Sequence, residues 1–257
     1  MSDPTLPNTH TNRIKKLPPL LINQLAAGEV VTRPASVVKE LIENAIDATA
    51  THIEVRITQG GMGMIEVRDD GCGIEADDMV MAVTRYATSK VADVANLQGI
   101  CTLGFRGEAL AATAAVSRLT LISSTDDSGI GRQLELAGIL TENPTLTPVV
   151  HPKGTLVRVQ DLYFNVPARR GNLKSIATEF AHIEAVVKQL ALVASHVTFE
   201  LWHGGKRRFM MEGVTNQRYQ PEHSQINVTH SSYRHAKLLS RMAVLLPQPF
   251  MPDSSEA

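Results

Sequence analysis

The sequence predicts an α+β protein in which helices cover one face of a mostly antiparallel, mixed sheet. Short segments of alternating apolar residues follow one another across glycine loops, which favours antiparallel hairpins. Segments with apolar residues at helical spacing lie between these strands. The chain has 257 residues, of which 43% are hydrophobic and 20% charged, so it can bury a sizeable core and is typical of globular proteins.

The first predicted helix covers residues 34–48, PASVVKELIENAIDA. Pro34 suits its first turn, because the N–H that proline lacks has no partner there in any helix. Its apolar stripe consists of Val38, Leu41, Ile42, Ala45 and Ile46. The remaining predicted elements are, in order, strands 52–58 and 64–69, helices 75–86 and 107–116, strands 118–124, 132–137 and 154–160, helix 176–194, and a hairpin over 197–211.

The composition excludes several classes of protein. A net charge of -1 excludes a strongly basic coat for nucleic acid, although not a local basic patch. Two cysteines, Cys72 and Cys101, are too few for a disulfide scaffold or a four-thiolate zinc site. No apolar run reaches the ~18–20 residues that span a bilayer, and residues 1–16 lack the apolar core of a signal peptide. We therefore expect a cytoplasmic protein with no membrane contact.

The chain divides into three parts by pattern. Residues 1–16 are polar and are predicted to be a flexible extension. Regular patterns fill residues 17–212, which we expect to form one domain. From residue 213 to 257 the composition shifts toward Gln, Asn, Ser, Thr and His without an apolar period, apart from a short apolar patch.

The first helix carries a polar face opposite its apolar stripe. With ~100° per residue, Glu43, Asn44 and Asp47 fall within about 60° of Glu40. No lysine or arginine follows any of them at four residues, so we expect the repulsion between the carboxylates to be uncompensated. Either solvent or a divalent cation can relieve it. Asn44 offers the oxygen ligand that Mg²⁺ prefers, and a carboxylate one turn away can accept a proton from an attacking water.

Two glycine loops are further candidate sites. In RDDGCGI (68–74), Asp69 ends a predicted strand, and Gly71 and Gly73 permit close approach by a ligand. The loop is either an ordinary Asp-Gly turn or a carboxylate placed to accept a hydrogen bond from an exocyclic amine. GFRGEAL (104–110) leads into a helix and is either a simple cap or an anion site at the helix N-terminus.

Hydroxyl and basic clusters complete the candidates. TSK (88–90) is either an exposed loop or a phosphate contact. Arg169, Arg170 and Lys174 gather in NVPARRGNLKS, and KRR (206–208) adds a second basic cluster. Both clusters are either solvated surface or contacts to nucleic-acid phosphates, which would make binding salt-dependent.

The order of these motifs resembles the GHKL ATPase superfamily, and above all the MutL family of mismatch-repair proteins. LINQLAAGEVVTRPASVVKELIENAIDA (21–48), RDDGCGI, ATSK (87–90), LGFRGEALA (103–111) and NVPARR (165–170) are similar to MutL signature segments. The resemblance covers roughly residues 17–212 and implies the Bergerat-type sandwich of that superfamily. A histidine-kinase or topoisomerase ATPase module fits less well, because no phospho-acceptor helix is recognisable.

The resemblance also implies a role for each matching residue. Glu40 is the general base for the water that attacks the γ-phosphate, and Asn44 binds Mg²⁺. Asp69 hydrogen-bonds the adenine amine in a pocket shaped by Gly71 and Gly73. The other implied ATP-binding residues are Asp47, Leu103, the lid residues Thr88, Ser89 and Lys90, the phosphate-wrapping residues Gly104, Phe105, Arg106 and Gly107, and Thr155 at the adenine end. Asp70 stands where the family has asparagine, and we expect it to add negative charge near the nucleotide.

The implied function is DNA mismatch repair by an ATP-binding switch with slow, Mg²⁺-dependent hydrolysis. ATP would dimerise two copies of the domain, and the dimer would couple a MutS-type mismatch sensor to a downstream endonuclease and helicase. The resemblance also implies weak DNA binding, which we expect to involve Arg169, Arg170 and Lys174. A bacterial, nucleoid-associated location follows.

The resemblance stops near residue 212. MutL proteins continue into a second lobe that supplies a lysine to the γ-phosphate, and residues 213–257 do not resemble it, so we expect a divergent or frameshifted tail in its place. One cationic contact to developing charge can contribute ~10²–10³ in rate, so turnover is expected to be weak or absent with nucleotide binding retained. The alternative is a catalytically impaired fragment that binds only nucleotide or partners.

Overall fold

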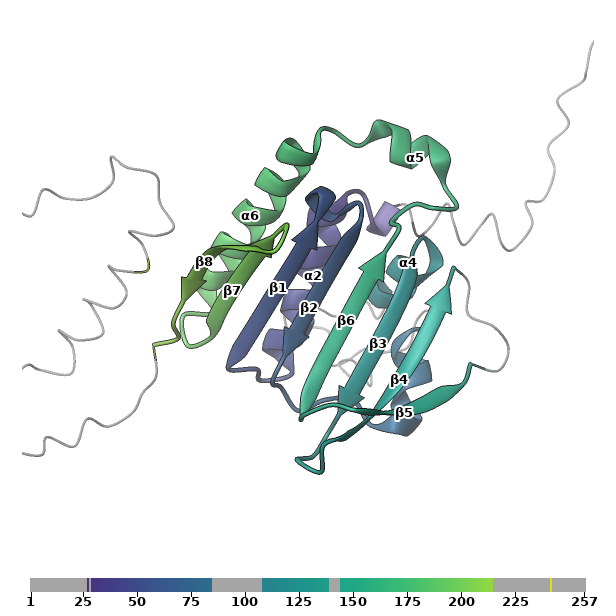
Figure 1. Cartoon of the computed structure of the whole chain (residues 1–257), viewed down its shortest axis with the longest axis vertical. Coiled ribbons are helices and arrows are strands. Elements are labelled where there is room, and N and C mark those ends of the chain that lie inside the picture. The colour runs from purple at the N-terminus through teal and green to yellow at the C-terminus, as the bar shows by residue number, and fades with distance from the viewer. Residues whose placement is uncertain (1–26, 28, 85–107, 139–143, 215–240, 242–257) are drawn as a thin grey trace, which may run out of the picture.

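A computed structural model describes residues 27, 29–84, 108–138, 144–214 and 241. They form an eight-stranded sheet in the order β5-β4-β3-β6-β2-β1-β7-β8, with α2, α4 and α6 behind one face (Figure 1). Among the described strands, β1 and β7 pair in parallel and the other neighbours pair antiparallel. The predicted fold class, a mostly antiparallel mixed sheet with helices on one face, is confirmed.

The strands are β1 His52–Thr58, β2 Met64–Asp69, β3 Arg118–Ser124, β4 Ile130–Ala137, β5 Leu146–Val150, β6 Gly154–Gln160, β7 Thr198–His203 and β8 Lys206–Met211. The helices are α2 Pro34–Asp47, α3 Met79–Ala82, α4 Ala109–Ala115, α5 Pro167–Asn172 and α6 Ile176–Val193, with 3₁₀ turns at Gln59–Gly61 and Ala76–Asp78. None of the helices in this described part of the chain is long and apolar enough to cross a membrane.

Most predicted elements lie where the patterns put them, and the differences have local causes. The helix predicted over 75–86 is instead a 3₁₀ turn followed by the short α3, which ends at Ala82. β5 was not predicted, because Pro148 interrupts its pattern; proline is tolerated there since β5 is an edge strand. α5 was not predicted either, because none of its residues is buried and it has no apolar stripe.

The core lies between the sheet and the layer formed by α2 and α6. Val38 and Ile42 of α2 and Ile183 and Val187 of α6 are fully buried, and the two helices pack along each other. α2 begins with Pro34 at its first turn, as predicted. Burying the apolar stripe of α2 fixes which residues face outward, and these include Asn44, which is exposed.

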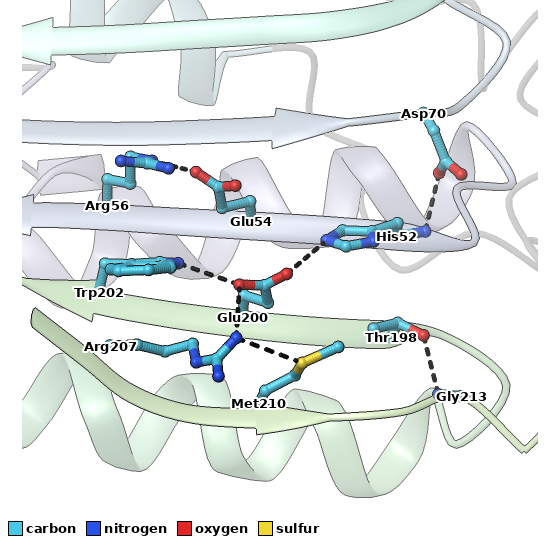
Figure 2. Close-up of polar contacts among 10 residues, drawn as sticks. All are labelled: His52, Glu54, Arg56, Asp70, Thr198, Glu200, Trp202, Arg207, Met210 and Gly213. Carbon is cyan, nitrogen blue, oxygen red and sulfur yellow. Dashed lines mark hydrogen bonds and ion pairs between the residues drawn. The ribbon is translucent and has the colours of Figure 1, made fainter.

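The opposite face of the sheet is polar where β1, β7 and β8 meet (Figure 2). Glu200 lies at its centre: His52 Nε2 is 3.3 Å from Glu200 Oε1, and Trp202 Nε1 donates to Glu200 Oε2 at 3.2 Å. Arg207 Nη1 lies 3.8 Å from the same carboxylate, and the Arg56 guanidinium stacks over the Trp202 ring at 5.0 Å. Arg207 of β8 and Glu200 of β7 pair opposite charges across two strands, which stabilises the sheet at this edge.

Candidate functional site

The polar face of α2 is smaller than the sequence predicts. Glu40 and Asp47 are half-buried and Asn44 is exposed, but Glu43 is only 6% exposed. Lys39, four residues before Glu43, places its Nζ 2.8 Å from Glu43 Oε1. The expectation of uncompensated carboxylates is therefore wrong at Glu43, because the pairing cation precedes the carboxylate instead of following it. Glu43 belongs to the fold, and Glu40, Asn44 and Asp47 remain as candidates.

The C-terminal end of α2 rests on the loop that follows β2. The Cys72 amide donates to the Ala48 carbonyl at 2.9 Å. A Cβ on Gly71 would lie 2.7 Å from the same carbonyl oxygen, so only glycine permits this approach. The contact places the end of α2 that carries Asn44 and Asp47 against the loop that begins at Asp69.

Asp69 is a buried carboxylate, only 9% exposed, at the end of β2. Its Oδ1 accepts from the Gly71 amide at 2.9 Å, and the backbone of Thr155, its register partner on β6, also hydrogen-bonds it. Burial raises the pKa of Asp69 to about 6, against these hydrogen bonds, and the charge of Asp70 adds to the rise. A carboxylate held this way is charged at neutral pH at a cost in stability, and a ligand that donates a hydrogen bond to it would relieve that cost.

Thr155 and Ser123 form a hydroxyl pair beside Asp69. Their oxygens lie 3.0 Å apart, and the Ile74 amide donates to Ser123 Oγ at 2.8 Å. Ser123 therefore ties the loop after Asp69 to β3 and β6. Sequence reasoning missed Ser123; the available signal was a serine pair directly after the apolar Leu121 and Ile122 at the end of the strand.

Two glycines permit close packing of the backbone at this end of the sheet. Gly154 has φ +121, and a Cβ there would lie 2.1 Å from the Asp69 carbonyl oxygen. Gly73 has φ +76, and a Cβ there would lie 2.2 Å from the Ser124 carbonyl oxygen. Both positions combine a backbone conformation that disfavours side chains with a space that excludes them.

Replacing Gly73 with alanine is expected to destabilise the fold by more than backbone strain alone. Gly129 is the matched control, because it has the same φ of +76 and no atom within 4 Å of its Cβ position. Gly129→Ala should cost about 1–2 kcal/mol for the left-handed backbone, and Gly73→Ala about 3 kcal/mol or more because the Ser124 strand must also move. Urea unfolding measures both, and equal losses would contradict the packing described here.

Asp70 has a structural role that the sequence did not indicate. Its Oδ1 accepts from the amides of Thr51 at 2.7 Å and His52 at 2.8 Å, and its Oδ2 accepts from Thr51 Oγ1 at 2.5 Å. Figure 2 shows the contact with His52. Burial opposes ionisation, but these hydrogen bonds hold the pKa of Asp70 below its usual value. The carboxylate thus caps the turn into β1, and its charge acts on the candidate site by raising the pKa of Asp69.

Half of the predicted site lies outside the described residues. This applies to the lid residues Thr88, Ser89 and Lys90, to Leu103, and to the phosphate-wrapping residues Gly104, Phe105, Arg106 and Gly107. The structure does describe the helix that follows them, α4, which begins at Ala109.

The predicted basic cluster lies on and after α5. Arg170 and Lys174 are exposed, whereas Arg169 is half-buried and its Nη1 lies 3.5 Å from the Val31 carbonyl oxygen. In the second cluster, Arg207 contacts Glu200 (Figure 2), and the Arg208 guanidinium lies 5.5 Å from the Phe180 ring centre. Arg207 and Arg208 are also exposed, but they already contact other side chains, so Arg170 and Lys174 are the candidates that we retain for phosphate contact.

Comparison with known proteins identifies the family. The family described as "Histidine kinase-, DNA gyrase B-, and HSP90-like ATPase" matches residues 32–156. "DNA mismatch repair protein MutL" of Aeromonas salmonicida is 53% identical over 193 residues, 75% of this chain and 31% of that protein. MutL of Pseudomonas aeruginosa is 50% identical over 209 residues, 81% of this chain and 33% of that protein. The chain thus spans about a third of the length of the curated relatives it matches.

Solved structures agree with the sequence relatives. The ATPase domain of Aquifex aeolicus MutL, described as complexed with ADP, superposes with a TM-score of 0.59 at 32% identity and covers 72% of this chain and 66% of that domain. The sheet and helices described above are therefore those of a GHKL sandwich. By these sequence and structural relatives, the chain belongs to the MutL family of GHKL ATPases and carries its N-terminal ATPase region.

Proposed function

We propose that the chain binds ATP with Mg²⁺ between α2 and the loop 69–73, and that it hydrolyses the nucleotide slowly as a switch in DNA mismatch repair. The observation that carries the proposal is Asp69, a carboxylate that is 9% exposed, has a pKa raised to about 6, and lies beside Gly73 and Gly154, where any side chain would crowd a backbone carbonyl oxygen. The complex of a solved MutL relative with ADP supports a nucleotide as the ligand.

Adenine is the base that Asp69 would favour. The ionised Asp69 carboxylate accepts hydrogen bonds and cannot donate them, so it suits the exocyclic amine of adenine. Thr155 Oγ1, within 3.0 Å of Ser123 Oγ, offers a second polar group beside Asp69. Guanine presents a carbonyl oxygen in place of that amine, and it would face the Asp69 carboxylate with two acceptors opposed.

Glu40 and Asn44 are proposed to act on the phosphate end. They lie four residues apart on α2 and hence on one face, about 5–6 Å apart at Cβ. The exposed Asn44 amide oxygen is a suitable Mg²⁺ ligand, and Asp47 lies one turn further along the helix. Bound Mg²⁺ would neutralise charge on the phosphates. Glu40 would take the proton of the attacking water, and Gly104, Phe105, Arg106 and Gly107 would wrap the phosphates.

The biological role is inferred from the relatives. MutL proteins of 50–53% identity are named for DNA mismatch repair. We propose that residues 17–212 act as an ATP-dependent homodimer, with Thr88, Ser89 and Lys90 in a lid over the nucleotide. The dimer would pass the signal of a MutS-type mismatch sensor to an endonuclease and a helicase.

Calorimetric titration with a non-hydrolysable ATP analogue and Mg²⁺ tests the nucleotide site. Saturable binding is expected for the unchanged chain. Asn44→Ala should weaken it at least ~10-fold, because the metal loses a ligand, without altering circular dichroism, since the Asn44 side chain is exposed. Absence of binding by a folded protein would reject the proposal.

DNA binding by the α5 region predicts a salt effect. Replacing Arg170 and Lys174 together with alanine should lower DNA affinity and reduce the slope of log K against log salt by about 1.8, at ~0.9 per lost phosphate contact. Arg207→Ala is the control, because Arg207 already contacts Glu200. Fluorescence anisotropy between low and high salt measures the slope, and an unchanged slope in the double variant would place DNA elsewhere.

A further inference from the structure

Arg241 lies 3% exposed at the edge of the ATPase fold, far along the chain from its contacts. Its Nη2 donates to the carbonyls of Ala191 at 2.8 Å and Val197 at 3.2 Å. Its Nη1 donates to the carbonyls of Ser195 at 2.9 Å and Val197 at 3.3 Å, and also to that of Glu212. One guanidinium thus joins four backbone carbonyls that come from three parts of the fold.

The four carbonyls converge for reasons of topology. Ala191 belongs to the last turn of α6, where backbone carbonyls lack partners within the helix and carry the negative end of its dipole. Ser195 and Val197 lie in the turn from α6 to β7, and Glu212 directly follows β8. Because β7 and β8 form a hairpin, the end of β8 returns beside that turn.

Two further hydrogen bonds fix the same corner. The Gly213 amide donates to Thr198 Oγ1 at 2.9 Å (Figure 2), and the Val214 amide donates to the Ser195 carbonyl at 2.9 Å. Carbonyls held this closely would repel one another without a cation. An arginine fits because its two terminal nitrogens direct their N–H groups from one fixed plane, whereas a lysine presents a single compact ammonium.

We infer that the carbonyls of Ala191, Ser195, Val197 and Glu212 form a guanidinium socket, and that Arg241 in this socket anchors the chain beyond β8 to the ATPase fold. Arg241 follows Glu212 by 29 residues. The ATPase fold is then completed beyond the boundary at 212 that the composition suggests. The anchor binds α6, the helix that packs along α2, so Arg241 is held against the layer that carries Glu40 and Asn44.

Two substitutions in the full chain test the socket. Arg241→Ala removes the cation, and Arg241→Lys keeps the charge but loses the fork. Hydrogen exchange at the Gly213 and Val214 amides should accelerate at least ~10-fold in Arg241→Ala and also measurably in Arg241→Lys. Amides of the β1–β2 pair should keep their protection, which shows that the variants are folded. Unchanged exchange at Gly213 and Val214 in both variants would overturn the inference.

Chemical rescue distinguishes the binding of a cation by the four carbonyls from the attachment of the chain through Arg241. Ethylguanidinium at tens of millimolar should restore slow exchange at Val214 in Arg241→Ala, and ethylammonium at the same concentration should not.

Proteolytic cleavage after Lys237 should be at least ~10-fold faster in Arg241→Ala, and ethylguanidinium should leave it fast, because a free cation fills the socket without holding the chain. If Arg241→Ala and the unchanged chain are cleaved at equal rates without ethylguanidinium, Arg241 anchors nothing. Lys206→Ala, a substitution at an exposed position of β8, should match the unchanged chain in both assays.

Discussion

Asp69→Asn is expected to abolish adenine-nucleotide binding and, at the same time, to make the ligand-free protein more stable at pH 7. Asparagine keeps an oxygen that can accept from the Gly71 amide, so the loop after β2 should hold its shape. The amide has no charge and directs donors as well as an acceptor toward the ligand. We expect affinity for ATP to fall at least ~100-fold, since a buried, charged partner of a hydrogen bond is lost.

The stability gain follows from the raised pKa. Asp69 has a pKa of about 6 in the folded protein, above the ordinary value of 3.8, so folding opposes its ionisation. At ~1.4 kcal/mol for each pKa unit, this costs the native state up to about 3 kcal/mol at pH 7. As pH falls from 7 through 6 toward 4, the native carboxyl takes up a proton before the unfolded one does, so the cost disappears. Urea unfolding should give Asp69→Asn a free energy of unfolding about 1–3 kcal/mol higher than that of the unchanged chain at pH 7.5. At pH 4 the two values should be nearly equal.

The neighbouring Asp70 provides a control of opposite sign. Hydrogen bonds from Thr51 and His52 outweigh its burial and hold its pKa below the usual value. Such a group stabilises the fold above its unfolded pKa, and the stabilisation is lost as pH falls through the folded pKa. Asp70→Asn should therefore destabilise the protein at pH 7.5. The difference in free energy of unfolding between this variant and the unchanged chain should shrink below pH 4. If both substitutions shift stability in the same direction at pH 7.5, the environments assigned to the two carboxylates are wrong.

Glu40→Ala is expected to stop ATP hydrolysis while leaving nucleotide binding intact. In the proposed mechanism Glu40 contacts the attacking water and not the nucleotide, so its loss removes proton transfer in the transition state and no contact to the nucleotide. General-base catalysis contributes ~10²–10⁴ in rate, and the single-turnover rate should fall by about that factor. The binding constant for a non-hydrolysable analogue should change less than ~3-fold.

Glu184→Ala is the matched control for Glu40→Ala. Glu184 is a helical carboxylate paired with Lys188 on α6, and it is not among the proposed site residues. Its removal should leave both turnover and binding unchanged. Hydrolysis by Glu40→Ala at the rate of the unchanged chain would show that another group activates the water.

Local pattern was enough to predict the sheet and the main helices. The bounds of β1 and β2 follow from the alternation of apolar and polar residues, those of β3 and β6 from apolar-rich segments, and α2 follows from its apolar stripe and Pro34. β5 carries a proline and α5 buries no residue. Those two elements are fixed by their neighbours in space, which a local pattern does not contain.

The candidate site was predicted less completely, for the same reason. The motifs located Asp69, but its burial depends on the end of α2 and on β6, which only the tertiary fold brings together. Ser123 belongs to no motif and joins the site through strand pairing. Glu43 was assigned to the polar face because it lies at its edge, where packing and the Lys39 ion pair decide burial. Arg241 contacts residues tens of positions away, and no sequence pattern indicated it.

The most direct test of the central claim compares ADP with GDP in calorimetric titrations of one sample at pH 7.5. The account places the ionised Asp69 carboxylate against the base, so ADP should bind saturably and GDP at least ~100-fold more weakly, because two acceptors would then face each other in a buried site. Equal affinity for the two nucleotides, or binding of neither by a protein shown to be folded, would contradict the assignment of Asp69 as the adenine-recognising residue.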